Sequence, residues 1–245
     1  MAHVDVHAEF DLDSPTLVEG LPGAGLVGKI AADHLVEQFE MTHVASCFCE
    51  GLPPVAVYRG NSSETMPPVR IYADEERNLL VLQSDVPVSP SQADEFAGCL
   101  TGWFADNDVF PLYLSGLPEE KDGVPEVYGI ATGGATDRLD EAGVVPPRES
   151  GLVSGPTGAL IHEANVSGLA SVGLIAETEA QFPDPEAARA VISNGIEPLA
   201  GIEVETDALV DQAEKIQEAR ERLARQVQEA EGDESTEARP IRGFQ

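Results

Sequence analysis

The feature of the sequence that most limits its fold is a glycine-rich turn between a β-like run and an amphipathic stretch. Residues 16–20 form the run, residues 21–25 form the turn, and residues 26–39 form the stretch. Within that stretch Ile30, Leu35 and Phe39 recur near helical spacing, which predicts a helix. A strand, a tight turn and a helix in this order make a β-turn-α unit, which is typical of α/β domains.

The rest of the chain also consists of β-like runs and helical segments in alternation. Asp184-Pro185 is typical of a helix start, because Asp accepts free N–H groups and Pro fits the first helical position. Apolar runs alternate with helical segments, which implies βαβ crossovers. We therefore expect an α/β fold, a three-layer αβα sandwich with a mainly parallel sheet, plus a long C-terminal helix. The runs that we interpret as strands are 44–49, 79–82, 109–115, 127–132 and 170–176, and the helices are 91–106, 137–142 and 157–165.

The composition changes near residue 206, which divides the chain into three predicted parts. Residues 1–205 are the α/β domain, 206–231 an amphipathic C-terminal helix, and 232–245 a disordered acidic tail. The apolar seam of the helix fits packing against its own domain and helix pairing between subunits equally well. The seam residues are Leu209, Ala213, Ile216, Leu223 and Val227.

The charge of the chain limits its partners. Its 245 residues include 44 Asp and Glu against 14 Lys and Arg, a formal net charge of -30, and Lys29, Lys121 and Lys215 are its only lysines. A surface this acidic repels nucleic acid and anionic lipid, so we expect neither as a partner. Dispersed carboxylates with few lysines also predict a halophilic protein, because molar salt shortens the Debye length to about 3 Å and screens self-repulsion.

We expect a cytoplasmic protein that does not enter a membrane. No apolar run approaches the roughly 20 residues that a membrane-spanning helix needs. The first ten residues have neither the basic start nor the apolar core of a signal peptide.

The cysteines and histidines suggest no metal site. Cys47, Cys49 and Cys99 are an odd number in a chain of this size, which predicts reduced thiols instead of a disulfide framework. The Cys-x-Cys spacing has no second pair and no histidine partner at a zinc-ligand spacing, so it is a poor zinc pattern. His3 and His7 precede the first clear strand, and we interpret them as a solvated pair.

The glycines of the turn match a dinucleotide-binding pattern. Gly23, Gly25 and Gly28 satisfy G-x-G-x-x-G between a strand and a helix, and Glu50 follows the second expected strand, at the place of the acid that binds the ribose in that pattern. A plain structural turn and a small-anion or nucleotide site at the helix N-terminus fit the same residues. All three interpretations stay open.

The same residues with Lys29 satisfy G-x-x-x-x-G-K. Position 30 is Ile, however, so the hydroxyl group that holds Mg²⁺ in a P-loop is missing, and an NTPase is disfavoured. If the loop binds an anion, the candidate residues are Gly23, Gly25, Gly28 and Lys29. Glu177, at the end of an expected strand, is a general base or, more commonly for such acids, a loop cap.

The sequence assigns no catalytic residue. No G-x-S-x-G nucleophile elbow and no H-E-x-x-H spacing occurs. We therefore predict no cofactor, and the sequence leaves open whether the chain is an enzyme while leaning against it.

Six strings of the sequence occur in an order that is typical of one protein family. They are residues 17–28 (LVEGLPGAGLVG), 82–85 (LQSD), 128–132 (YGIAT), 151–158 (GLVSGPTG), 174–178 (LIAET) and 183–185 (PDP). Over residues 15–225 the chain thereby resembles the archaeal branch of the proteasome assembly chaperone family. The resemblance implies an α/β sandwich like that of phosphorylase/hydrolase-type proteins, no established catalytic activity, self-association, and contact with proteasome α subunits. Residues 1–205 would be the family domain.

The resemblance also singles out the C-terminus. Family members that bind the proteasome often end in a hydrophobic residue, Tyr and any residue, a tail that inserts between α subunits. The matching positions here are Gly243, Phe244 and Gln245, in which Phe keeps the ring and lacks the phenol. Phe244 and Gln245 are thus the candidate docking residues.

The leading hypothesis is a non-enzymatic, proteasome assembly chaperone-like protein that binds proteasome α subunits or related partners as a homo-oligomer. The alternative is a nucleotide- or phosphate-binding enzyme or sensor that uses the Gly23–Gly28 loop. A second alternative is a structural oligomer assembled through its C-terminal helix.

Overall fold

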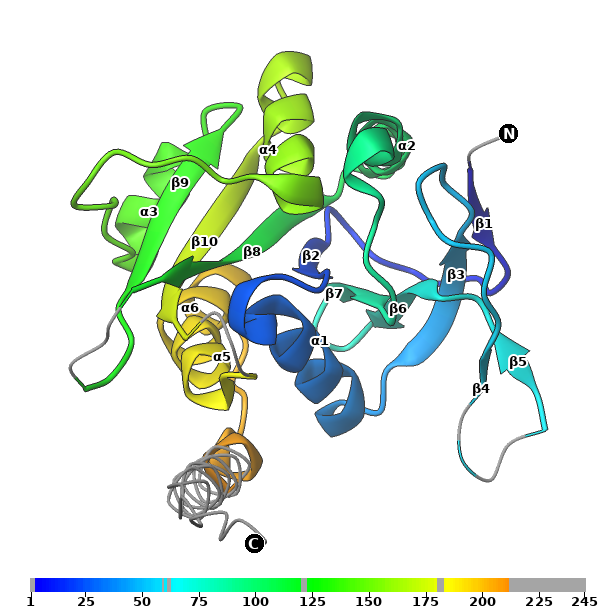
Figure 1. Cartoon of the computed structure of the whole chain (residues 1–245), viewed down its shortest axis with the longest axis horizontal. Coiled ribbons are helices and arrows are strands. Elements are labelled where there is room, and N and C mark those ends of the chain that lie inside the picture. Colours follow the sequence, from blue (N-terminus) through cyan, green and yellow to red (C-terminus); the bar gives the residue numbers. More distant parts are fainter. Residues whose placement is uncertain (1–2, 59, 61–62, 120–122, 180–182, 212–245) are drawn as a thin grey trace, which may run out of the picture.

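A computed structural model describes residues 3–58, 60, 63–119, 123–179 and 183–211. In this part of the chain, an eight-stranded sheet lies between two layers of helices (Figure 1). A separate two-stranded hairpin, β4 (Val57–Tyr58) and β5 (Thr65–Met66), projects from one end. In spatial order the sheet contains β1 (Val4–Val6), β3 (Thr42–Cys47), β6 (Val69–Asp74), β7 (Leu79–Ser84), β2 (Thr16–Gly20), β8 (Phe110–Pro118), β10 (Ser171–Thr178) and β9 (Val127–Thr132).

The expected α/β sandwich is confirmed, with a mixed and mostly parallel sheet. The four central strands β7, β2, β8 and β10 are parallel to one another. Antiparallel strands complete both ends: β6, β3 and β1 on one side and β9 on the other. The parallel strands are buried on both faces, which explains their nearly continuous apolar sequences.

The two helical layers enclose separate cores. One layer is α2 and α4, which bury Phe96, Leu100 and Leu160 against the sheet. The other contains α1, α3, α5 and α6, which bury Leu35, Leu139 and other apolar side chains against the opposite face. The helix bounds are α1 Val27–Gln38, α2 Ala93–Asp106, α3 Thr136–Ala142, α4 Gly155–Ser167, α5 Pro185–Val191 and α6 Glu197–Ala200, with short helical turns at Ala24–Leu26, Pro90–Gln92 and Ile192–Ile196.

The predicted start of α5 is confirmed. Asp184 is the N-cap residue, and its carboxylate accepts the N–H of Ala187 at 3.1 Å, while Pro185 occupies the first helical position.

The C-terminal predictions lie largely outside the described residues. A helical turn begins at Asp207 and the description ends at Asp211, with Leu209 buried against the domain. The rest of the predicted helix 206–231, the tail 232–245 and the candidate docking residues Phe244 and Gln245 lie beyond it. No helix of the described part is both long enough and apolar enough to cross a membrane.

The prediction that all three thiols are reduced is wrong. A disulfide joins Cys49 and Cys99, whose Cα atoms lie 6.0 Å apart, and Cys47 is free and buried. The sequence could not show this pairing, because α2 must first pack over the end of β3 before Cys99 meets a residue 50 positions away. The odd number of cysteines reflects one bridge and one buried thiol.

Candidate functional site

The glycine-rich loop lies at the topological switch point of the sheet. After β2 the chain passes through α1 towards β3, whereas the crossover through α2 leads from β7 to β8 on the other side of β2. Ligands of open α/β sheets commonly bind outside the carboxyl ends of the strands at such a point. The pairing of β2 with β8 ends at Val18 and Leu112, so the two strands separate just before the loop.

The space at this switch point is filled by the protein's own residues. Gly25 adopts a φ of +61°, and a Cβ there would collide with the side chain of Thr178 on β10. A Cβ at Gly28 would press on Leu114 of β8 at 3.2 Å. Gly23, in contrast, has nothing within 4 Å of an added Cβ. Close packing therefore accounts for Gly25 and Gly28 without a ligand, and the anion site stays a prediction.

Asp184 fastens the loop to the segment after β10. Its carboxylate accepts the hydroxyl of Thr178 at 3.0 Å, and its backbone N–H donates to the carbonyl of Gly25 at 2.8 Å. The same carboxylate caps α5 through Ala187. One buried Asp thus holds the glycine loop, β10 and α5 in fixed positions.

Glu19 fills the gap where β2 and β8 separate, and it is completely buried. Its Oε2 accepts the N–H of Leu114 at 2.9 Å, and its Oε1 accepts the N–H of Leu21 at 3.2 Å and the hydroxyl of Thr157 on α4 at 3.1 Å. Burial raises the pKa of Glu19 to about 7, and these three hydrogen bonds offset only part of the effect. The carboxyl group therefore changes its charge near neutral pH.

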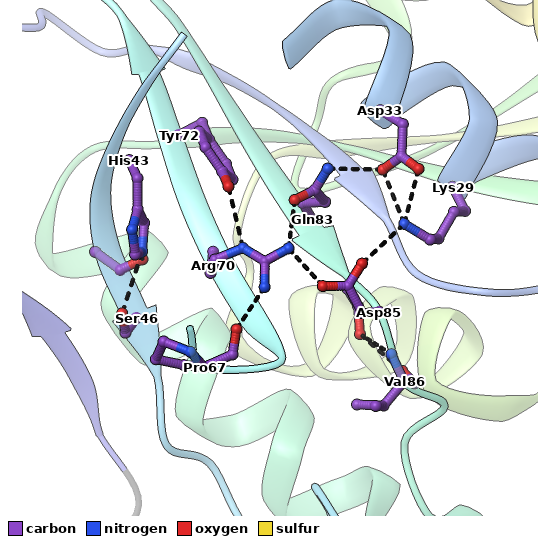
Figure 2. Close-up of polar contacts among 12 residues, drawn as sticks. Lys29, Asp33, His43, Ser46, Pro67, Arg70, Tyr72, Gln83, Asp85 and Val86 are labelled. Carbon is purple, nitrogen blue, oxygen red and sulfur yellow. Dashed lines mark hydrogen bonds and ion pairs between the residues drawn. The ribbon is translucent and has the colours of Figure 1, made fainter. Parts of the chain in front are cut away.

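Lys29 belongs to a polar network at the ends of α1, β6 and β7. Its ammonium group contacts both oxygens of Asp33, at 2.9 and 2.8 Å, and Oδ1 of Asp85 at 3.3 Å (Figure 2). The amide of Gln83 donates to Asp33 at 2.8 Å. The positive charge predicted to attract an anion is thus paired with two carboxylates of the chain.

Arg70 is the centre of this network and is completely buried. Its guanidinium donates to Oδ2 of Asp85 and Oε1 of Gln83, both at 2.6 Å, and to the hydroxyl of Tyr72 at 3.1 Å (Figure 2). It also donates to the carbonyl of Pro67. Burial alone would raise the pKa of Asp85, but the hydrogen bond and charge of Arg70, with those of Lys29, hold this pKa below its ordinary value.

Glu50, the candidate ribose-binding acid, does not lie near the glycine-rich loop. Glu50 follows β3, and strands β6 and β7 separate β3 from β2. A dinucleotide bound at the loop would therefore not reach this acid in the usual way, because the usual fold has these two strands adjacent.

Glu177 makes contacts of the capping kind. Its Oε2 accepts the N–H of Glu126 at 3.0 Å, and its Oε1 lies 3.0 Å from the hydroxyl of Tyr128, which also donates to Glu126 at 2.6 Å. Arg148 pairs with Glu126 at 2.6 Å. This cluster joins the ends of β9 and β10, and the role of general base stays untested.

His7 meets a partner that the sequence did not suggest. Its Nε2 lies 3.2 Å from Nε2 of His43 on β3, whereas His3 stacks on Phe48. Burial and, next, the neighbouring His7 lower the pKa of His43. Among the described residues, no group of three His, Cys, Asp or Glu side chains is placed to hold a metal ion.

Sequence reasoning missed Glu19 and Arg70, which lie inside β-like runs. A charged residue within an apolar run is the signal that was available, because such a residue is buried only with partners. The partners themselves were not visible, since Gln83 reaches Arg70 through the antiparallel register of β6 and β7.

Comparisons with known proteins agree with this geometry. The model of the family described as "PAC2 family" matches residues 17–224. An uncharacterized protein of Methanocaldococcus jannaschii is 27% identical over 222 residues, which are 89% of each chain. The crystal structure of Pyrococcus furiosus PbaA, described as an archaeal homolog of proteasome-assembly chaperone, matches with a TM-score of 0.77 and 27% identity over 94% of this chain and 100% of that chain. Pyrococcus furiosus PbaB, described as an archaeal proteasome activator, has the same fold, with a TM-score of 0.75 and 24% identity over 91% and 98% of the two chains.

Proposed function

Because the chain belongs to the PAC2 family, we propose that it is a cytoplasmic, proteasome assembly chaperone-like protein that binds proteasome α subunits or related partners as a homo-oligomer. The observation that carries the proposal is the match to PbaA, which spans that whole chain and nearly all of this one. The switch point supports it too, because Glu19, Thr178 and Asp184 fill the place where an α/β enzyme commonly binds its substrate. A protein of this kind acts through its surface.

The first experiment measures complex formation with proteasome α subunits from the same organism. Light scattering gives the mass of the protein alone, of the mixture, and of a mixture in which residues 243–245 are deleted. About 3 M KCl suits a chain with a net charge of -30, because it screens self-repulsion. A complex that is lost on deletion supports docking through Phe244 and Gln245. A complex that survives assigns the contact to the folded domain, and no complex with any α subunit contradicts the proposal.

The alternative, a phosphate or nucleotide sensor at the loop, is tested by thermal unfolding with added phosphate, nucleotide or NAD. A ligand that binds the folded state raises the melting temperature. Gly23→Val is the informative variant, because that position has free space, whereas a substitution at Gly25 would unfold the loop for steric reasons. A stabilisation of wild type that Gly23→Val removes would favour the sensor over the chaperone.

A further inference from the structure

Two imidazole groups, those of His7 and His43, meet at the edge of the sheet. His7 directly follows β1, and its backbone N–H donates to the carbonyl of Val44 on the neighbouring strand β3 at 3.0 Å (Figure 1). This pairing brings His7 to His43, 36 positions away, with their Nε2 atoms 3.2 Å apart and their ring centroids 4.4 Å apart. The spacing in the sequence favours His3 as the neighbour of His7, so the pair is a product of the fold.

The distance between the two Nε2 atoms fits two ligands of one metal ion. An imidazole nitrogen binds Zn²⁺ at roughly 2.0–2.1 Å, so two such nitrogens at an angle of about 90–110° lie about 2.9–3.4 Å apart. The observed 3.2 Å falls inside this range. Imidazole is a preferred ligand of Zn²⁺, Cu²⁺ and Ni²⁺. Both rings can therefore bind the same ion with little movement.

Oxygen atoms surround the same nitrogen of His43. The carbonyl oxygen of Ala45 lies 3.1 Å from its Nε2, and the hydroxyl oxygen of Ser46 lies 3.2 Å from it (Figure 2). With Nε2 of His7, three atoms that can accept a hydrogen bond thus lie around one nitrogen, which carries at most one proton. A metal ion bound to both rings would lie close to these oxygens as well.

An acidic cleft opens beside His7. Its volume is about 780 Å³, and Glu9, Asp11 and Glu75 line it together with His7. The backbone N–H of Asp11 donates to Oε1 of Glu75 at 2.8 Å, which joins the two sides of the cleft. Among the lining residues that the structure describes, none is Lys or Arg. Carboxylates along a concave surface raise the local concentration of cations, here next to the imidazole pair.

We propose that His7 and His43 bind a divalent transition-metal ion, Zn²⁺ or Cu²⁺, with water in the positions that the protein leaves open. Each ring then carries its own proton on Nδ1. The ion would fasten β1, an edge strand of three residues, to β3. Two protein ligands make a weaker and more exchangeable site than the four of a structural zinc site. The inference goes beyond the proposed function and does not rest on it.

The test is thermal unfolding of protein treated with EDTA, titrated with ZnCl₂ in the KCl solution used for light scattering. His7→Gln and His43→Gln each remove one ligand. His162→Gln removes an exposed imidazole from α4 and is the matched control. The melting temperature without metal shows whether each variant folds. MgCl₂ is the control ion, because Mg²⁺ prefers oxygen ligands and would bind to the carboxylates of the cleft instead.

We expect Zn²⁺ to raise the melting temperature of wild type by about 5–10 °C at a hundredfold excess of free ion over the dissociation constant. Loss of even an outer-shell partner typically weakens metal binding about 10–100-fold, so either variant should weaken it at least about tenfold. His162→Gln should bind as wild type does. Electron paramagnetic resonance of the Cu²⁺ form should show two coordinated nitrogen atoms in wild type and one in either variant.

Three results would overturn the inference. The first is a wild-type protein that Zn²⁺ does not stabilise. The second is an affinity that stays at the wild-type value in His7→Gln or in His43→Gln, because one imidazole would then be enough. The third is equal stabilisation by Mg²⁺, which would assign the ion to the carboxylates of the cleft. Binding of α subunits is measured separately and decides the proposed function alone.

Discussion

The two helical layers cover the same sheet but differ in whether the buried charged side chain beneath them has a partner of opposite charge. On the α1 side, Arg70 is fully buried and paired with Asp85, and Lys29, Asp33 and Gln83 complete the network. On the α2–α4 side, Glu19 is fully buried, and it accepts hydrogen bonds from two backbone N–H groups and the hydroxyl of Thr157. A buried charge that lacks a counter-charge is neutralised by a shift in pKa. One layer therefore keeps its charges, and the other carries a group that titrates near pH 7.

The layers also differ in covalent attachment. The disulfide between Cys49 and Cys99 ties α2 to the end of β3. Among the described residues, the corresponding attachment of α1 is ionic, through Lys29 and Asp85. We therefore expect salt and acid to weaken the stabilising contacts of the α1 side. Reductant and neutral pH should instead weaken those of the α2–α4 side.

The largest effect is expected for Arg70→Leu. Removal of the guanidinium leaves Asp85, Gln83 and Tyr72 without their shared donor, so we expect a loss of about 3–5 kcal/mol in the free energy of unfolding. Urea unfolding followed by circular dichroism measures it. Arg148→Leu removes an Arg that is 72% exposed and pairs with Glu126, and its effect should be below about 1 kcal/mol. Equal effects of the two variants would mean that the buried network does not stabilise the α1 side.

The second effect concerns the disulfide. A bridge between residues 50 positions apart restricts the unfolded chain, and Cys99→Ala should cost about 2–4 kcal/mol. Dithiothreitol should lower the stability of wild type to that of the variant and leave the variant unchanged, as measured by urea unfolding with and without reductant. A wild-type curve that is insensitive to reductant would show that the bridge does not form in solution.

The third effect is a dependence of stability on pH. The folded state raises the pKa of Glu19 from 4.5 to about 7, so it binds this proton more tightly than the unfolded state does. The contribution of Glu19 is therefore fully present below about pH 4.5 and is lost as the pH rises to about 7, a change of up to roughly 3 kcal/mol. Asp85 acts in the opposite direction, because its lowered pKa gives stability that is lost in acid.

Urea midpoints between pH 5 and 8 test this dependence, and Glu19→Gln should flatten the profile. Glu37→Gln, which removes an exposed carboxylate from α1, is the matched control and should keep the wild-type slope. A Glu19→Gln profile as steep as that of wild type would assign the dependence to another group.

The smallest effect is expected for Lys29→Met. The Lys29 side chain is 21% exposed, and Asp85 keeps Arg70 as its partner, so the loss should be about 0.5–1 kcal/mol and should shrink as KCl rises. Unfolding at two KCl concentrations measures it. A loss as large as that of Arg70→Leu would make Lys29 the centre of the network.

Local sequence patterns predicted many of the elements. The run before the glycine turn, the apolar run that became β7, and the Asp184-Pro185 helix start all formed as expected. Each of these depends on residues within a few positions of one another. The short edge strand β1 was missed, because three residues carry too little periodicity to be recognised before β3 is there to pair with them.

The contacts of the candidate site depended on long-range placement. Glu19 meets Thr157, and Gly25 meets Thr178, across more than a hundred positions of the sequence. The glycine pattern alone fitted a dinucleotide site, an anion site and a plain turn. Only the packed structure shows that close contact with β10 and β8 requires glycine at positions 25 and 28. It also shows that a Cβ at Gly23 would meet nothing within 4 Å.

The sequence by itself determined the α/β class, the acidic surface and the family, because these depend on local periodicity, composition and ordered motifs. The tertiary structure decided the order of the strands, the disulfide, the pairing of Arg70 with Asp85 and the burial of Glu19 without a counter-charge. The physical reason is that burial and pairing are properties of groups brought together from distant positions. A carboxylate beside an arginine stays charged and one beside backbone N–H groups titrates near neutral pH, and nothing in either local sequence distinguishes the two.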